Sequence, residues 1–516
     1  MMPMMKTWTT VIMVLSILCF SCSKDLGNYA YSELSDPGIG GIDEEYSVLT
    51  HEQFTITPTG DFASSEWEFR WSAVSLGNDR QSFEIAATRT LDMEMTLDEG
   101  DYTLVFRAKD MKTGVFWEKQ AKLEVREITS EGWMVLCDAD GESRLDFVSA
   151  ITGRTYTDIL DRTFTGPHRI FYSYYAETSS PFYLTSDECT TRLSRYGFAW
   201  KDEFLLDYEM GEGKAGKISA MEDGAGDKIM ISDGQAYHAG CTVSIGLFGA
   251  IEGAEDLAPA IGVNRLTRNI VVPAYLLYDT KEKRFLGYAP NLATSDLGYN
   301  KALNEMNDLV SLLGNMDNGG SVIGTAFQKF PQGYDFVHME STIYDPNNTS
   351  MGMIYTVLKD GNSFYVYGIQ LGEMWGAVTI GDCTCAIGRT LYKDISSCTS
   401  IAKAEHFAFS PMSAMMYYSV GGSIYSADLS VTKPTAKKIL SFDGEQVTVL
   451  KFQKYEDVLN YERQFDLIVG SVTDSGNGTL RVYEGYTSGG SFSSVQPQTV
   501  NGLGNIVDVS YRENLN

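Results

Sequence analysis

The chain has 516 residues, and its 40 basic and 68 acidic residues give a net charge of −28 at pH 7. This length exceeds one ordinary domain, and 43% hydrophobic residues can fill a sizeable core. So negative a field repels nucleic acids and argues against a nucleic-acid partner. The 30 tyrosines, 49 glycines and only 13 prolines favour an all-β secreted protein.

The first segment indicates export followed by lipid attachment. Lys6 precedes an apolar run, residues 11–20, that has about half of the roughly 20 residues a membrane-spanning helix needs. Ser21-Cys22 at its end resembles a bacterial lipobox, in which Cys22 becomes the lipidated first residue of the mature chain. Cys19 is a rival position that follows a large residue, and the other alternative is an ordinary signal peptide with a free cysteine. We expect residues 1–21 to be removed and the lipid on Cys22 to be the only membrane anchor.

Residues 22–127 are predicted to form a β-sandwich. Two stretches, 65–74 and 97–110, place aromatic and aliphatic residues at every second position. Gly100-Asp101-Tyr102 leads into the second stretch, and it resembles the start of a strand in immunoglobulin-like and PKD-like sandwiches, where a tyrosine hydroxyl fixes a corner. The Cys…Trp…Cys pattern of antibody domains is absent from the sequence, so we predict a PKD-like sandwich.

Residues 128–516 contain a repeated hairpin pattern. Each repeat has an apolar strand, a polar turn that often contains Asp or Gly, and a second strand with Tyr or Leu. Neighbouring repeats are roughly 50 residues apart, which predicts a β-propeller with four strands per blade and seven blades. A large irregular β-sandwich is the alternative. The repeats begin at Trp133, Phe182, Ile229, Leu276, Ile354, Met416 and Leu467.

The widest gap between repeats contains a helical pattern. Leu303, Met306, Val310 and Leu313 recur at helical spacing, which predicts an inserted helix of about 15 residues within 295–320. We expect this insertion to contact a partner or cargo on one propeller face, and the alternative is a helix that only fills a gap between blades.

The sequence carries no local catalytic motif. Its five histidines are scattered, and it contains no HExxH, GxSxG or phosphate-binding loop. Asp138, Asp140 and Asp146 superficially resemble a calcium loop, but the twelfth-position glutamate is missing and a hairpin turn belongs there. We therefore predict no catalytic residue, no metal and no cofactor.

Two further groups of residues have a structural and a functional interpretation. The aromatic segment 171–183 either fills a blade, which we favour, or contacts a sugar or peptide. The six cysteines beyond Cys22 lack metal-site spacing and are expected to be buried thiols, although Cys398 could pair with Cys383 or Cys385 after export. These six are Cys137, Cys189, Cys241, Cys383, Cys385 and Cys398.

The lipobox, the sequence KDLGNY at 24–29, the sandwich and the repetitive β region together resemble the PKD-like lipoprotein family of Bacteroidetes. The resemblance is closest over the first 130 residues or so, and only Cys22 transfers as a functional residue. It implies a lipoprotein on the extracellular face of the outer membrane, with SusC/SusD-like importer subunits and a further surface lipoprotein as partners.

We therefore expect a non-catalytic accessory component of a SusCD-type nutrient importer that captures oligopeptide or oligosaccharide cargo. The tryptophans are scattered, which slightly favours peptide over sugar. The alternative function is a propeller glycoside hydrolase or lyase acting on an extracellular polysaccharide. That enzyme would need two or three carboxylates from different blades around the central funnel.

Overall fold

The computed structural model describes residues 36–514 except 51, 64–65, 78–79, 174–180, 196, 211–215, 225–226, 241–246, 264–274, 289–302, 306–328, 347–351, 373–378, 381–382, 385 and 456–457. The chain divides into two compact units, Met1–Arg126 and Glu127–Asn516. Within the described ranges, no helix is long and apolar enough to cross a membrane. The predicted lipid-bearing Cys22 lies outside these ranges.

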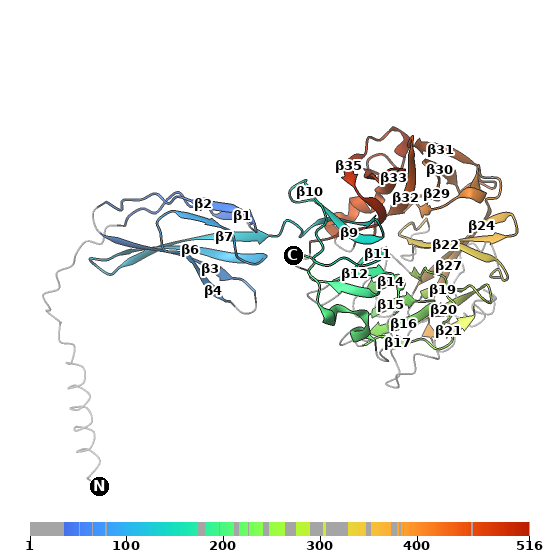
Figure 1. Cartoon of the computed structure of the whole chain (residues 1–516), viewed down its shortest axis with the longest axis horizontal. Coiled ribbons are helices and arrows are strands. Elements are labelled where there is room, and N and C mark those ends of the chain that lie inside the picture. Colours follow the sequence, from blue (N-terminus) through green and yellow to red (C-terminus); the bar gives the residue numbers. More distant parts are fainter. Residues whose placement is uncertain are drawn as a thin grey trace, which may run out of the picture. The chain divides into compact units, whose positions relative to one another are not determined.

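The first unit is a β-sandwich (Figure 1). Its larger sheet has the order β1-β7-β6-β3-β4, with β1 parallel to β7 and the other pairs antiparallel. The second sheet pairs β2 with β5. The strands are β1 (Glu45–Leu49), β2 (Gln53–Ile56), β3 (Trp67–Ser75), β4 (Ser82–Ala86), β5 (Leu91–Glu94), β6 (Gly100–Asp110) and β7 (Phe116–Arg126).

Side chains at every second position of the strands form the sandwich core, as the sequence predicted. In β6 the even-numbered residues from Tyr102 to Ala108 are buried, while the residues between them are at least partly exposed. The hydroxyl of Tyr102 donates a hydrogen bond of 2.9 Å to the carbonyl oxygen of Asp98. The tyrosine corner is therefore confirmed.

The second unit is a β-propeller, and its described residues form seven antiparallel sheets of three or four strands (Figure 1). The first three sheets are β36 (Asn505–Arg512), β8 (Gly132–Ala139), β9 (Glu142–Ser149) and β10 (Thr155–Tyr156); β11 (Pro167–Tyr172), β12 (Phe182–Ser186) and β13 (Thr190–Leu193); and β14 (Ile218–Gly224), β15 (Asp227–Ser232), β16 (Gln235–Gly240) and β17 (Gly249–Ala250).

Four more sheets complete the set. They are β18 (Gly262–Val263), β19 (Tyr275–Asp279), β20 (Arg284–Tyr288) and β21 (Leu303–Glu305); β22 (Asp335–Thr342), β23 (Met353–Asp360), β24 (Ser363–Gly372) and β27 (Ala386–Asp394); β28 (Phe407–Phe409), β29 (Met415–Val420), β30 (Ser423–Asp428) and β31 (Ala436–Ser441); and β32 (Glu445–Phe452), β33 (Leu467–Thr473), β34 (Gly478–Tyr483) and β35 (Gln498–Leu503). A small hairpin, β25 (Thr379–Ile380) and β26 (Cys383–Thr384), interrupts the fifth sheet.

The last strand closes the ring. β36 pairs with β8, so the first sheet contains strands from both ends of the unit. β36 also contacts β11 and β32, the first strands of the neighbouring sheets, and β28 contacts both β22 and β32. The first strands of the sheets therefore surround the propeller axis.

Six of the seven predicted repeats form the two middle strands of a four-stranded sheet, and the repeat from Phe182 forms β12 and β13, the middle and edge strands of the three-stranded sheet. These middle strands read as nearly continuous apolar runs: all five residues of β19 and the first six of β23 are buried. A blade packs between two other blades, so both of its faces are covered and alternation is lost. The propeller fold is confirmed.

The predicted helix at Leu303–Leu313 is wrong where the structure describes it. Leu303, Asn304 and Glu305 form β21, which pairs with β20 at the edge of its sheet. The open edge of β20 offers backbone partners, and this tertiary context overrides the helical spacing of the side chains. The rest of the predicted insertion, 295–302 and 306–320, lies outside the described residues.

Candidate functional site

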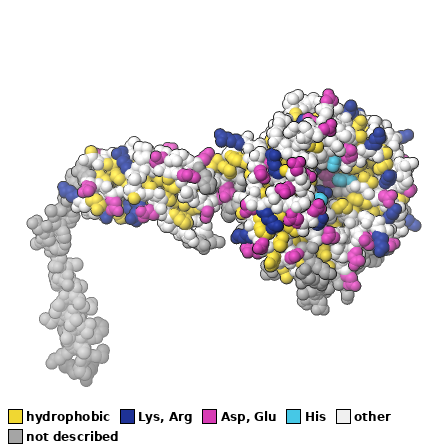
Figure 2. All heavy atoms as spheres, in the orientation of Figure 1, with side chains coloured by type: hydrophobic (Ala, Val, Ile, Leu, Met, Phe, Trp, Pro, Cys, Tyr) yellow, Lys and Arg dark blue, Asp and Glu magenta, His cyan; other side chains and the backbone are white. Residues whose placement is uncertain are grey.

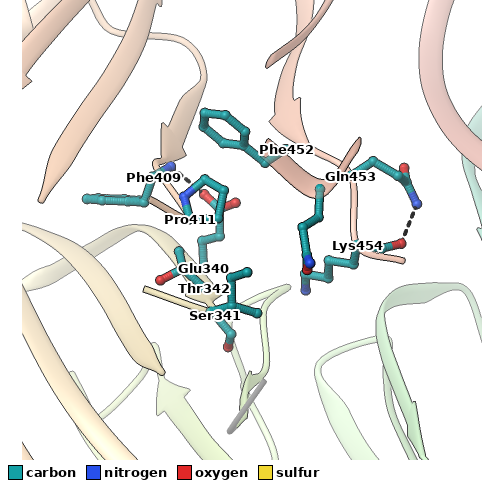
Figure 3. A pocket seen from close by; sticks show the side chains of 10 residues that line it. Glu340, Ser341, Thr342, Phe409, Pro411, Phe452, Gln453 and Lys454 are labelled. Atoms are coloured by element: carbon teal, nitrogen blue, oxygen red, sulfur yellow. Dashed lines mark hydrogen bonds between the residues drawn. The ribbon is translucent and has the colours of Figure 1, made fainter. Parts of the chain in front are cut away.

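A pocket lies where β22, β28 and β32 end, beside the propeller axis (Figure 3). The empty space in and in front of the pocket, open solvent included, is about 310 Å³. Figure 3 shows Glu340, Phe409 and Pro411 on one side and Gln453 and Lys454 on the other. The lining residues are Glu340, Ser341, Thr342, Ile343, Phe409, Pro411, Phe452, Gln453, Lys454 and Gln464.

The charged groups of the pocket already have partners. Glu340 Oε2 accepts a 2.9 Å hydrogen bond from the backbone N–H of Phe409, and His338 Nε2 lies 3.6 Å from the same oxygen. Lys454 Nζ lies 2.8 Å from Glu222 Oε1, which belongs to β14 of the third sheet. These contacts link four of the propeller's sheets around the axis, so the charges position the strands as well as the pocket wall.

The aromatic residues of the pocket are packed against the core. The Phe409 ring is fully buried and stacks on Tyr355 with centroids 4.4 Å apart and planes 7° apart. Phe452 is also buried and contacts Tyr417 and Phe492. The accessible lining is still mainly apolar, and carboxylate, ammonium, amide and hydroxyl groups make up the smaller, polar part of it.

A second carboxylate near the axis is also engaged. Asp508 of β36 accepts hydrogen bonds from the backbone N–H of Ile170 in β11 at 3.0 Å and from that of Val509 at 2.9 Å. Lys451 Nζ of β32 lies 3.4 Å from the same carboxylate. Asp508 therefore connects β36, β11 and β32, and its carboxylate oxygens accept hydrogen bonds that hold these strands together.

Histidine side chains gather near the middle of the propeller face seen in Figure 2. The pKa of His406 is lowered mainly by burial, and nearby His338 and Arg169 lower it further, while Glu405 acts in the opposite direction. A lowered pKa keeps this imidazole neutral at neutral pH. His406 is therefore a polar group of the axis region that carries no charge under physiological conditions.

The segment that superficially resembles a calcium loop forms the turn of a hairpin, as the sequence favoured. Asp138 Oδ1 accepts the N–H of Gly141 at 2.7 Å within the turn between β8 and β9. Asp146 is buried and paired with Arg144 at 2.7 Å. Across the described ranges, no three His, Cys, Asp or Glu side chains converge as a metal site would need.

The other predicted candidates are also structural where they are described. Phe182 and Tyr183 are buried in their blade, and Tyr172 donates to the carbonyl of Glu513 at 3.2 Å, so this part of the aromatic segment fills the blade. Cys398 is a free, buried thiol that donates to the carbonyl of Pro434 at 3.7 Å. Cys385, the side chain of Cys383 and residues 174–180 lie outside the described parts.

Sequence reasoning missed the pocket. Glu222, Glu340 and Lys454 come from three blades and are more than 100 residues apart in the chain. No local motif marks residues of this kind, because only ring closure brings the ends of the first strands together. Glu222 and Glu340 each lie three residues after a β-bulge in the first strand of their sheet. This shared position can be recognised only from the observed strand pairing.

Comparison with known proteins gives a match to one family model. Residues 22–167, which include the whole sandwich and β8 to β10, match the model of the PKD-like family. None of the curated proteins compared matches the chain.

Several solved structures are similar to this chain at low identity. A quinonprotein alcohol dehydrogenase-like protein from Bacteroides thetaiotaomicron is 12% identical with a TM-score of 0.41, covering 91% of this chain and 97% of that one. A DUF4784 family protein from Bacteroides caccae is 10% identical with a TM-score of 0.28, covering 92% and 98%. The WD40 domain of Neurospora crassa Pan2 is 8% identical with a TM-score of 0.32, covering 64% and 78%.

Proposed function

We propose that the protein is a non-catalytic surface lipoprotein that binds oligopeptide or oligosaccharide cargo for a SusCD-type importer. The observation that carries this proposal is the pocket at the ends of β22, β28 and β32, which is open to solvent, lined from three blades and mainly apolar with a few polar groups. Small-molecule sites commonly occupy such concave positions, where a few polar groups set the orientation of the ligand.

The state of the carboxylates favours binding over hydrolysis. A glycosidase places one carboxyl group as acid and a second as base or nucleophile on either side of the scissile bond. Glu340 instead accepts a backbone N–H, Glu222 faces Lys454, and Asp508 accepts two backbone N–H groups. A carboxylate held in this way has fewer oxygen lone pairs available for a substrate or water.

The N-terminal segment supports a place at the cell surface. The match of residues 22–167 to the PKD-like family model agrees with the family that the sequence around Cys22 resembles. In this proposal the lipid on Cys22 anchors the chain, the sandwich separates the propeller from the membrane, and the propeller presents the pocket to cargo.

The proposal is tested by purifying the full-length protein from outer membranes in mild detergent and identifying what accompanies it. We expect SusC- and SusD-like subunits with the native protein, and loss of both membrane retention and these subunits in Cys22→Ala. Importer subunits absent from the native preparation, or equal membrane retention of both proteins, would contradict it.

Catalysis is tested separately. Incubating the protein with polysaccharides should release no new reducing ends or unsaturated products. Product formation that Glu340→Gln abolishes would instead support the glycoside hydrolase or lyase.

A further inference from the structure

Two exposed tyrosines in the connections around β33 and β34 each contact the ring of the same buried phenylalanine. Tyr461, in η5 (Val458–Phe465), is 53% exposed, and Tyr486, in the loop after β34, is 44% exposed. Their rings lie 5.3 Å and 5.6 Å from the ring of Phe465, which is only 5% exposed. We call Tyr461 and Tyr486 the tyrosine pair.

The loop that carries Tyr486 is fixed in place. The N–H of Gly485 donates to Asp466 Oδ1 at 3.0 Å, and the N–H of Gly490 donates back to the carbonyl of Gly485 at 3.0 Å. A Cβ atom at position 485 would lie 1.8 Å from the carbonyl oxygen of Phe465, so only glycine permits this approach. The backbone of the loop that carries Tyr486 is thus held before a ligand arrives, which lowers the ordering cost of binding.

The tyrosine pair adjoins the pocket described above. Gln464 lines that pocket. The rings of both tyrosines contact the ring of the next residue, Phe465. η5 lies in the connection between β32 and β33, at the same end of the first strands as the pocket. A ligand longer than the pocket could therefore continue onto the tyrosine pair.

The surroundings of the tyrosine pair indicate the chemistry of such a ligand. Glu462 directly follows Tyr461, and Glu484 lies two residues before Tyr486. Both glutamates are exposed. The guanidinium of Arg463 is turned toward Glu131 and Tyr511. Carboxylates accept hydrogen bonds and cannot donate them when ionised, so this surface suits a ligand rich in donors and free of negative charge.

We propose that the tyrosine pair binds a sugar ring of a neutral oligosaccharide whose neighbouring unit occupies the pocket. This inference rests on the proposed function and names the class of its cargo. The C–H face of a pyranose ring is apolar and weakly positive, and it complements the negative face of an aromatic ring. The sugar hydroxyls then donate to the flanking carboxylates, whereas an acidic glycan is repelled by them and by the net charge of −28.

The experiment measures binding to the detergent-extracted full-length protein by isothermal titration calorimetry. The probes are neutral hexasaccharides (cello-, malto-, manno- and xylo-oligosaccharides), hexagalacturonate as the acidic comparison, and a tryptic digest of casein as the peptide comparison. The variants are Tyr461→Ala, Tyr486→Ala and their double mutant. Tyr208→Ala is the matched control, because Tyr208 is 64% exposed in a different blade. The melting temperature of each variant reports whether it is folded.

We expect at least one neutral hexasaccharide to bind and hexagalacturonate not to bind. Each single substitution should weaken binding by roughly tenfold, and phenylalanine at either position should retain most of the affinity, because the ring face makes the contact. Tyr208→Ala should bind like the native protein.

Two results would overturn the inference and leave the proposed function standing: peptide binding without oligosaccharide binding, or oligosaccharide binding that the double mutant retains. Binding of neither class by a protein that still co-purifies with importer subunits would overturn the inference and the cargo-binding role together.

Discussion

Strand β6 of the sandwich and strand β23 of the propeller bury their side chains in different patterns. In β6 the buried and the partly exposed residues alternate, because one face packs on the core and the other meets solvent. In β23 every residue from Met353 to Leu358 is buried, because both faces of the blade pack against other blades. Strand β23 therefore has no face that tolerates substitution, whereas β6 keeps one.

The two units also differ in how they are completed. The sandwich strands all pair within Glu45–Arg126, so its sheets form from one continuous segment. The first sheet of the propeller needs β36, whose residue Tyr511 pairs with Trp133 from the other end of the unit. Long-range closure of this kind makes the whole ring depend on its last strand.

Deleting residues 505–516 is expected to have the largest effect. Ile506, Val509 and Tyr511 are buried, and their loss would expose the core of the first and seventh sheets. The loss should exceed the roughly 5–15 kcal/mol that stabilises a typical domain, so the propeller should not fold. Limited proteolysis should yield a stable sandwich fragment and a degraded propeller.

The complementary control is the fragment 128–516, which should fold and remain soluble without the sandwich. An insoluble fragment 128–516, or a deletion of 505–516 that keeps a cooperative propeller transition, would show that the two units are not independent in this way.

Alanine substitutions at consecutive positions test the burial patterns. Val357→Ala and Leu358→Ala in β23 should each lower the free energy of unfolding of the propeller by about 2–4 kcal/mol. In β6, Leu104→Ala should cost a similar amount, while the neighbouring Val105→Ala should cost only about 0.5 kcal/mol. Denaturant titration of the four variants measures these values. An equally mild effect at either β23 position would contradict burial on both faces.

The buried carboxyl group of Asp466 should make the stability of the propeller depend on pH, with a smaller effect than the core substitutions. Burial raises the pKa of Asp466 to about 6, although the N–H of Gly485 and the charge of Arg463 act in the opposite direction. The folded state therefore takes up a proton between about pH 4 and pH 6 that the unfolded state does not, so the contribution of Asp466 to stability falls as pH rises through this range.

Asp466→Asn keeps an acceptor for Gly485 and removes the charge. At pH 7.5 we expect the variant to be more stable than the native protein by about 1–2 kcal/mol, with the difference vanishing near pH 4. The matched control is Glu45→Gln in the sandwich, where loss of the exposed, solvent-screened pair with Lys122 at 3.0 Å should leave stability nearly unchanged. A pH-independent effect of Asp466→Asn would contradict the raised pKa.

The last prediction concerns the tyrosine corner of the sandwich. Tyr102→Phe removes the 2.9 Å hydrogen bond to Asp98 and should destabilise the sandwich by about 1 kcal/mol without affecting the propeller. Separate melting transitions, assigned with the fragment 128–516, measure both units at once. A shift in the propeller transition would show that the corner acts beyond its own unit.

The sequence predicted the parts of the fold that have a local signal. The middle strands of the propeller stand out because continuous apolar runs such as β19 and β23 are joined by polar turns. Strands β18 and β10 were not recognised, because they have only two residues each and are defined by their partners. β21 was mistaken for the start of a helix for the same reason.

The candidate site depended entirely on long-range contacts. Glu340 and Lys454 meet at the pocket because the ring closes, and Tyr461 and Tyr486 meet on Phe465 because two loops of one blade adjoin. The scattered tryptophans favoured a peptide cargo, but the exposed aromatic surface beside the pocket comes from tyrosines. In a sequence with 30 tyrosines, nothing distinguishes these two.

The most direct test of the central claim is co-purification of the native protein and of Cys22→Ala from outer membranes, with the attached subunits and bound cargo identified by mass spectrometry. A surface-anchored binding protein should bring importer subunits and an oligomeric ligand in the native preparation and neither from the membranes of the variant. A native protein that carries no importer subunit and no ligand would contradict the proposed function.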